Sequence, residues 1–131
     1  MSAYTVKEVD GMEAMFRGAM KRARAELGVE SFGMQITDLP PNSEHYPEHD
    51  HAADGQEEVY VVMRGGGEIE IDGERFPLDD NNVARVGPAA KRRVLPGPDG
   101  IRIAVLGGVP GAAYAAPDHT NLGQPDPMAA M

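Results

Sequence analysis

The chain has 131 residues, of which 41% are hydrophobic, and a formal net charge of −9 at neutral pH. This length favours one domain over residues 1–131 with a single core, and the negative charge argues against nucleic-acid binding, because phosphate backbones repel an acidic surface. There is no cysteine, the first ten residues lack the apolar stretch of a signal peptide, and no apolar run approaches a membrane span, so we expect a cytoplasmic protein without membrane contact.

Residues 11–27 are expected to form an amphipathic helix. Asp10 is a suitable N-cap, Glu13 three residues later completes a capping box, and Gly28 is a typical helix end. The apolar residues recur at helical spacing and make one stripe: Met12, Met15, Phe16, Ala19, Met20, Ala23 and Leu27. We predict that this helix packs against the outside of the β-structure that follows it.

The chain from about residue 31 to residue 107 has the pattern of short β-strands separated by turns. Gly65 to Gly67 is expected to form a tight turn between two strands, Asp72 and Gly73 a hairpin, and Pro96 to Gly100 another turn. Many short strands at this spacing are typical of an all-β sandwich or barrel. The predicted strands are Ser31–Leu39, Glu58–Arg64, Glu68–Asp72, Glu74–Leu78, Val83–Val86, Lys91–Leu95 and Ile101–Leu106. Residues 108–131 are expected to form an extended tail.

Three of the four histidines lie within residues 45–51. Side chains alternate between the two faces of a strand, so His49 and His51 should point to the same side. Glu58 stands at the start of the next predicted strand. Two imidazole nitrogens and a carboxylate from neighbouring strands are a suitable ligand set for a divalent transition metal such as Fe, Mn, Ni or Zn. We therefore predict that His49, His51 and Glu58 are metal ligands.

The excess negative charge is concentrated around these residues. Between Ala25 and Met63 the chain has no Lys or Arg, and the acidic residues there are Glu26, Glu30, Asp38, Glu44, Glu48, Asp50, Asp54, Glu57 and Glu58. An acidic surface attracts cations, although a solvated acidic loop can also serve solubility alone. The charge pattern thus favours a metal site without requiring one.

The histidine pair and the carboxylate resemble the first motif of the cupin superfamily, a group of small jelly-roll β-barrels. In that motif His-x-His is followed by Glu and, after six further residues, by Gly, as in His49, His51, Glu58 and Gly65. The resemblance covers roughly residues 32–106. It implies an all-β, cupin-like jelly-roll β-barrel, here with one N-terminal amphipathic α-helix.

The second cupin motif, Pro-x-Gly-x-x-His, is degenerate in this chain. It is matched by the segment that begins at Pro88, and Arg93 stands where the family has its last histidine ligand. The Asn that usually follows is replaced by Gly97, and the Gly that usually precedes the first motif is Ser43. Because a guanidinium cannot act as a metal ligand, one of the four ligands that the resemblance implies is missing.

Two functional readings follow. In the first, Arg93 turns away, and the two histidines and Glu58 hold a metal ion with open positions, with His45 and His119 as more remote replacement ligands. The resemblance then implies a small metalloenzyme of the dioxygenase or isomerase kind that acts on a small organic substrate.

In the second reading, Arg93 points into the barrel, pairs with Glu58 and excludes the metal. The protein is then a binding or sensing module for a small anionic or carbonyl-bearing ligand. Tyr60, which shares a strand face with Glu58, and Gln35 are further predicted ligand-binding residues. These side chains can equally belong to a core in which they make only structural hydrogen bonds, and the sequence alone leaves the alternatives open.

Both faces of the predicted strand Glu58–Arg64 carry apolar side chains. One face presents Val59, Val61 and Met63, whereas the other presents Tyr60 and Val62. A strand that is apolar on both faces favours a second covering layer, and we therefore predict a homodimer that binds a small-molecule ligand.

Overall fold

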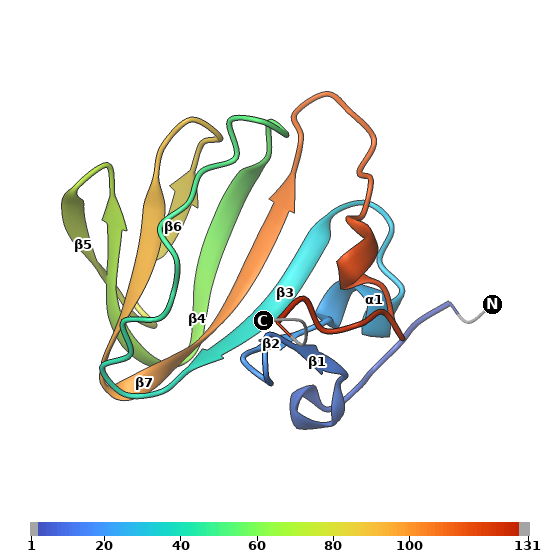
Figure 1. Ribbon diagram of the computed structural model, residues 1–131, viewed down its shortest axis with the longest axis horizontal. Helices are drawn as coiled ribbons and strands as arrows, with labels where there is room; N and C mark the ends of the chain where they lie inside the picture. The colour runs from blue at the N-terminus through green and yellow to red at the C-terminus, as the bar shows by residue number, and fades with distance from the viewer. Residues whose placement is uncertain (1–2, 129–131) are drawn as a thin grey trace.

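In this computed structural model, which describes residues 3–128, the strands form one strongly curved antiparallel sheet (Figure 1). The strands are β1 (Ala14–Met15), β2 (Met20–Lys21), β3 (Gly33–Leu39), β4 (Glu57–Ile71), β5 (Glu74–Leu78), β6 (Val83–Val86) and β7 (Arg92–Gly108). The sheet order is β1-β2-β3-β7-β4-β5, and β6 pairs with the first part of β4. The helices are η1 (Val9–Gly11), α1 (Ala23–Leu27) and η2 (Asp118–Thr120). Within residues 3–128, every helix is too short to cross a bilayer.

Two long strands, β4 and β7, run beside each other and form the middle of the sheet. The hairpin predicted at Gly65 to Gly67 is wrong, because these glycines lie inside β4 at a point where its pairing with β7 shifts register. Gly65 has a φ of 74°, and a Cβ there or at Gly67 would collide with the β7 backbone at Gly100 and Leu95. Glycine therefore lets the strands approach closely and curl. The turn predicted over residues 96–100 is likewise part of a continuous strand.

The inner face of the curved sheet encloses the main hydrophobic core. This core comprises Leu39, Tyr60, Val62, Ile69, Leu78, Val86, Val94, Ile101 and Ile103. On the outer face, Met63 is 47% exposed and Val83 is 68% exposed. The predicted alternation along β4 is thus observed, while the homodimer and the cytoplasmic location stay predictions.

The N-terminal segment is not the long helix predicted over residues 11–27. Only Ala23–Leu27 is α-helical, and β1 and β2 form a small hairpin whose second strand pairs with β3. Phe16 and Arg17 have positive φ values of 55° and 56°, so the chain reverses where the helix was expected to continue. Part of the apolar stripe is still buried, but on the outer face of the sheet, in a second cluster of Met12, Ala23, Ile36 and Ala104.

The C-terminal tail is held against this hairpin by hydrogen bonds. The Asp126 carboxylate accepts hydrogen bonds from the N–H groups of Phe16 and Arg17, both at 2.9 Å. The Glu13 carboxylate accepts one from the Gly123 N–H at 2.9 Å. These contacts connect the N-terminal hairpin with the C-terminal tail. A local sequence pattern such as a capping box therefore cannot reveal them.

Replacing Asp126 with alanine is expected to lower the melting temperature at neutral pH, because two hairpin amides lose their acceptor. Hydrogen bonds from the backbone amides of Arg17 and Met128 hold the pKa of Asp126 below its ordinary value. A lowered pKa gives stability that is present above the unfolded-state pKa and is lost as the pH falls through the folded-state pKa.

The difference in Tm between the native chain and Asp126→Ala should therefore shrink as the pH is lowered from about 5 to about 3. Asp118→Ala, a change in η2, serves as the matched control and should leave Tm unchanged. A difference that is independent of pH would show that the carboxylate charge does not hold the hairpin.

Candidate metal centre

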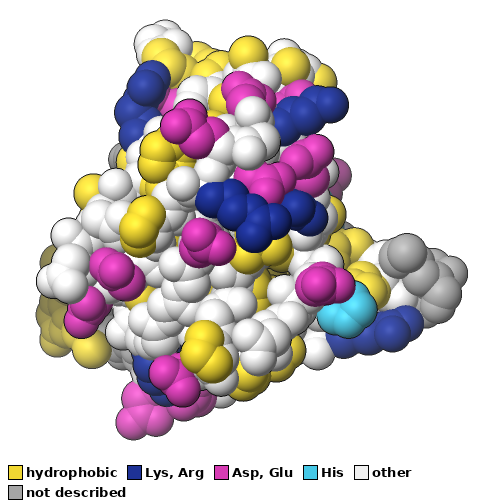
Figure 2. Space-filling model, turned by 90° about the vertical axis from the view of Figure 1, so that its left-hand side faces the viewer, with side chains coloured by type: hydrophobic (Ala, Val, Ile, Leu, Met, Phe, Trp, Pro, Cys, Tyr) yellow, Lys and Arg dark blue, Asp and Glu magenta, His cyan; other side chains and the backbone are white. Residues whose placement is uncertain are grey.

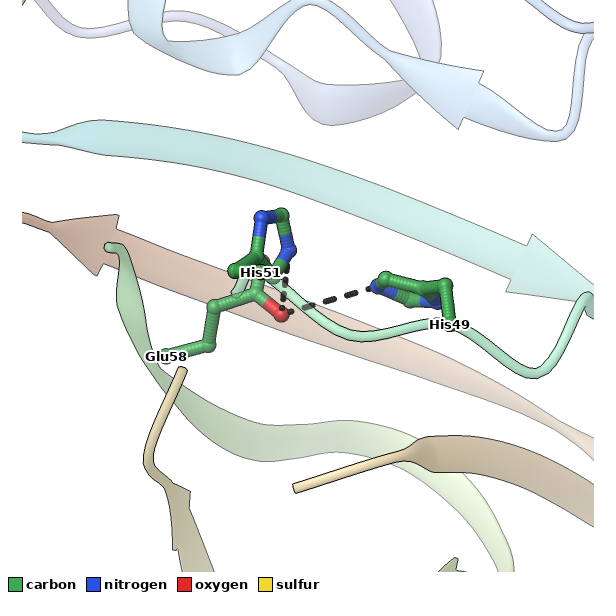
Figure 3. A group of neighbouring side chains, drawn as sticks. All are labelled: His49, His51 and Glu58. Carbon is green, nitrogen blue, oxygen red and sulfur yellow. Dashed lines mark ion pairs between the residues drawn. The ribbon is translucent and has the colours of Figure 1, made fainter. Parts of the chain in front are cut away.

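His49 and His51 lie on the segment between β3 and β4, and β7 holds this segment in place. The His49 N–H donates to the Arg92 carbonyl at 3.0 Å, and the Arg92 N–H donates back to the His49 carbonyl at 2.8 Å. The His51 N–H donates to the Pro88 carbonyl at 2.8 Å. With its backbone held in this way, the segment directs both imidazoles toward Glu58 at the start of β4 (Figure 3).

Three possible ligand atoms meet in this group. Glu58 Oε1 lies 3.2 Å from His51 Nε2 and 3.8 Å from His49 Nε2, and the ligand atoms of all three residues lie within 4.8 Å of one another. Two atoms bonded to one ion at about 2.1 Å are at most about 4.2 Å apart. Both distances to Glu58 meet this limit, so the structure brings together the three residues predicted as ligands in a group that could hold a metal.

The other ring nitrogens of the two histidines are already engaged. His49 Nδ1 lies 3.1 Å from the Pro47 carbonyl, and His51 Nδ1 lies 3.1 and 3.2 Å from the carboxylate oxygens of Asp54. Since a carbonyl or carboxylate accepts, each Nδ1 carries a proton, so in the neutral ring it is Nε2 that has the free lone pair. His51 Nε2 is buried and has no hydrogen-bond partner among residues 3–128. A buried imidazole nitrogen with a free lone pair is what a metal ion requires, so the donor set fits a metal.

Tyr60 holds the carboxylate in place. Its hydroxyl donates to Glu58 Oε1 at 2.8 Å, and the side chain is fully buried. Burial raises the pKa of the Tyr60 hydroxyl far above its ordinary value, so it remains a donor at neutral pH. The predicted ligand-binding residue Tyr60 therefore lies in the group, in contact with Glu58.

Glu58 and His49 affect each other's ionisation. Burial opposes ionisation of Glu58, but the nearby His49, the hydrogen bond from Tyr60, and the His51 and Arg92 side chains outweigh it and lower the pKa of the Glu58 carboxyl. The Glu58 carboxylate, 3.8 Å from His49 Nε2, favours the protonated ring and raises the pKa of His49. A metal ion bound at His49 would therefore displace a proton.

The arginine beside the site is Arg92, whereas the sequence motif predicts Arg93. Arg92 has no exposed surface, and its Nε lies 4.0 Å from Glu58 Oε1. Arg93 pairs instead with Glu70 at 3.2 Å. The motif count was wrong by one residue, which moves the side chain to the opposite face of β7. The residues that follow Arg93 in β7 are apolar on both faces of the strand. The alternation of polar and apolar side chains therefore did not reveal the error.

Three other predicted residues lie outside the group. Gln35 is on β3, and with its amide nitrogen facing the Lys21 carbonyl it donates there at 2.7 Å. His45 is exposed, and His119 lies in η2 with its ring 6.3 Å from that of Phe16. None of the three belongs to the group of possible ligands found in residues 3–128.

Tyr46 is a residue of the site that sequence reasoning missed. Its ring lies 5.8 Å from that of His49, and its side chain packs against the main core. Burial raises the pKa of Tyr46 to about 12. Its position beside His45 and Pro47 in a polar loop gave no sign of burial. With Tyr60, it gives the site a second neutral phenol.

Basic residues from other parts of the chain form ion pairs with some of the acidic side chains in this stretch. Such ion pairs are Lys7–Glu26 at 2.7 Å, Arg102–Asp38 at 2.6 Å and Arg85–Glu57 at 3.0 Å. Acidic and basic side chains are also interspersed on the face toward β5 (Figure 2). Glu58 and Asp54 contact the histidines directly, so these two carboxylates contribute most to attracting a cation to the site.

Comparison with solved structures identifies the fold. A cupin protein from Bacteroides fragilis is 22% identical, with 89% of this chain and 93% of that chain covered at a TM-score of 0.67. A protein from Photorhabdus luminescens is 15% identical over 82% of this chain and 88% of that chain, with a TM-score of 0.61. An RmlC-like cupin protein from Desulfovibrio desulfuricans is 22% identical over 60% of this chain and 73% of that chain, with a TM-score of 0.54.

These similarities show that the chain is an all-β protein with the cupin fold, a jelly-roll β-barrel, as its first motif predicts. No protein-family model matches the sequence, and a search of curated proteins found no significant match. The activity must accordingly be argued from the site, because one fold hosts many unrelated functions.

Proposed function

We propose that this chain binds one divalent transition-metal ion, namely Fe, Mn, Ni or Zn, through His49, His51 and Glu58. The supporting observation is that two Nε2 atoms converge on Glu58 Oε1 while both Nδ1 atoms are already engaged. Three protein ligands leave positions open, at which a bound ion would supply Lewis acidity toward a small organic molecule. The proposed activity is that of a small metalloenzyme of the dioxygenase or isomerase kind.

Two residues around the site favour binding of the metal ion, and one disfavours it. Tyr60 fixes the ligand oxygen of Glu58, and Asp54 orients His51. Arg92 opposes cation binding, with its Nε 4.0 Å from that same oxygen. Because Coulomb energy falls with distance, we expect the directly bonded carboxylate to outweigh the guanidinium, which weakens the site without abolishing it.

Elemental analysis of protein purified without a chelator or a histidine tag tests the proposal. We expect close to one equivalent of metal in the native chain, and in His45→Ala, whose side chain is exposed and outside the group. His49→Ala and His51→Ala should each lose the metal, because two remaining ligands hold such an ion weakly. Native protein that stays metal-free after incubation with each of the four ions would refute the proposal.

Asp54→Asn is expected to weaken metal binding about tenfold, because an amide holds the Nδ1–H of His51 less firmly than a carboxylate does. Asp50→Asn is the matched control, since among residues 3–128 the Asp50 side chain accepts only the Ala52 N–H, in its own loop. Competition with a chromogenic chelator measures both affinities. Equal affinity for the two variants would show that Asp54 does not position the ligand.

A second candidate function is a metal-free module that binds or senses a small anionic or carbonyl-bearing ligand. The sequence assigns this role to Arg93, but Arg93 is paired with Glu70. The proximity of the buried Arg92 to Glu58 is the observation that favours this alternative. Protein that binds small anions while remaining free of metal would support it over the metalloenzyme.

A further inference from the structure

Arg92 is a buried cation with too few hydrogen-bond acceptors. Its Nη2 donates to the carbonyls of Val86 and Gly87 at 3.2 and 2.7 Å. Its Nε and Nη1 are buried as well and have no hydrogen-bond partner within residues 3–128. Buried donors without an acceptor cost free energy, and native proteins satisfy nearly all of them. The guanidinium therefore lacks acceptors at two of its three nitrogens, including the Nε that lies nearest to Glu58.

Glu58 does not supply the hydrogen-bond acceptors that Arg92 lacks. Its Oε1 lies 4.0 Å from Arg92 Nε, too far for a hydrogen bond, and already accepts from the Tyr60 hydroxyl at 2.8 Å. The same oxygen faces His51 Nε2 at 3.2 Å. One carboxylate oxygen thus stands between the histidines and the guanidinium and is committed to the histidine side.

A bound metal ion would leave the site with an excess of positive charge. The ion and Arg92 together outweigh the charges of Glu58 and Asp54, and the Asp54 side chain is 52% exposed and therefore screened by water. Unbalanced buried charge is costly, and a negatively charged ligand reduces that cost. A carboxylate oxygen both ligates divalent ions and accepts strong hydrogen bonds from a guanidinium.

We propose that the site takes a small organic anion bearing a carboxylate, held between the metal position and Arg92. This inference rests on the proposed metal centre and names the class of ligand that the centre binds. Because Arg92 has no exposed surface, the anion reaches it only when a side chain of the site moves. His49, whose side chain is 32% exposed, is the ligand residue most open to solvent and marks the route of entry.

Calorimetry with acetate as the probe and acetamide as its neutral analogue tests the anion site in metal-loaded protein. Acetate should bind the native chain and Arg93→Gln equally well, because Arg93 faces Glu70. Arg92→Gln should bind acetate at least about tenfold more weakly, and acetamide should bind the native chain at least about tenfold more weakly than acetate. Circular dichroism establishes that each variant is folded.

Equal acetate affinity in all three proteins would overturn the anion site, as would native protein that binds acetate no better than acetamide. The second comparison needs no variant and decides the matter even if Arg92→Gln does not fold. The metal content of the same samples reports separately on the proposed function. Full metal loading without Arg92-dependent acetate binding rejects the anion site alone, whereas metal-free protein that binds acetate through Arg92 rejects the metal centre alone.

Discussion

Arg92→His is expected to bind Zn(II) or Ni(II) at least about a hundredfold more tightly than the native chain. The change removes a buried cation whose Nε lies 4.0 Å from Oε1 of the proposed ligand Glu58, and it places an imidazole next to His49 in the backbone pairing. A unit charge about 5 Å from a divalent ion costs about 6 to 7 kcal/mol at an effective dielectric constant of about 20. Relief of only half of that repulsion corresponds to more than about a hundredfold in affinity. Chelator competition at fixed pH measures the change.

Arg93→His is the matched control for this prediction. Arg93 forms a partly exposed ion pair with Glu70, so its replacement should leave metal affinity unchanged. If Arg93→His tightens binding and Arg92→His does not, Arg93 occupies the position of the missing ligand. The inward placement of Arg92 would then be refuted.

Glu58→Gln is expected to lower the free energy of unfolding of the metal-free protein by about 3 kcal/mol, because it leaves the buried Arg92 without its carboxylate. Urea unfolding in the presence of a chelator measures the change and removes any contribution from bound metal. The double variant Glu58→Gln/Arg92→Gln should recover much of the loss, because neither charge then remains buried.

Glu57→Gln provides the control on the neighbouring residue. Glu57 pairs with Arg85, which is largely exposed, so this change should alter the free energy of unfolding by no more than about 0.5 kcal/mol. Equal effects of Glu57→Gln and Glu58→Gln would mean that Arg92 does not depend on the carboxylate, and the charge argument for the site would fail.

The parts of this molecule that were predictable from sequence are those governed by local alternation and spacing. The predicted strands at Glu74–Leu78 and Val83–Val86 coincide with β5 and β6, because turn residues bound them on both sides. The candidate ligand group was predictable because His49, His51 and Glu58 lie within ten residues, and an isolated β-bridge joins His49 to Arg92 of β7.

The wrong predictions of the N-terminal helix and of the glycine turn share a cause, because contacts between distant segments decided them. A helix was predicted from the spacing of apolar residues and a capping pattern at Asp10, but Asp126 stabilises a reversal of the chain at Phe16 and Arg17. Gly65 was interpreted as a turn residue. Its positive φ and its lack of a side chain instead allow the backbone of β7 to pass close to β4. Such effects of tertiary structure are absent from the local sequence.

The pair of backbone hydrogen bonds between His49 and Arg92 ties a proposed metal ligand directly to the proposed anion-binding residue. Neither backbone can shift without displacing the other, so ordering one side chain also restricts the other. Cation and anion would then bind with positive heterotropic cooperativity, each raising the affinity for the other by the same factor.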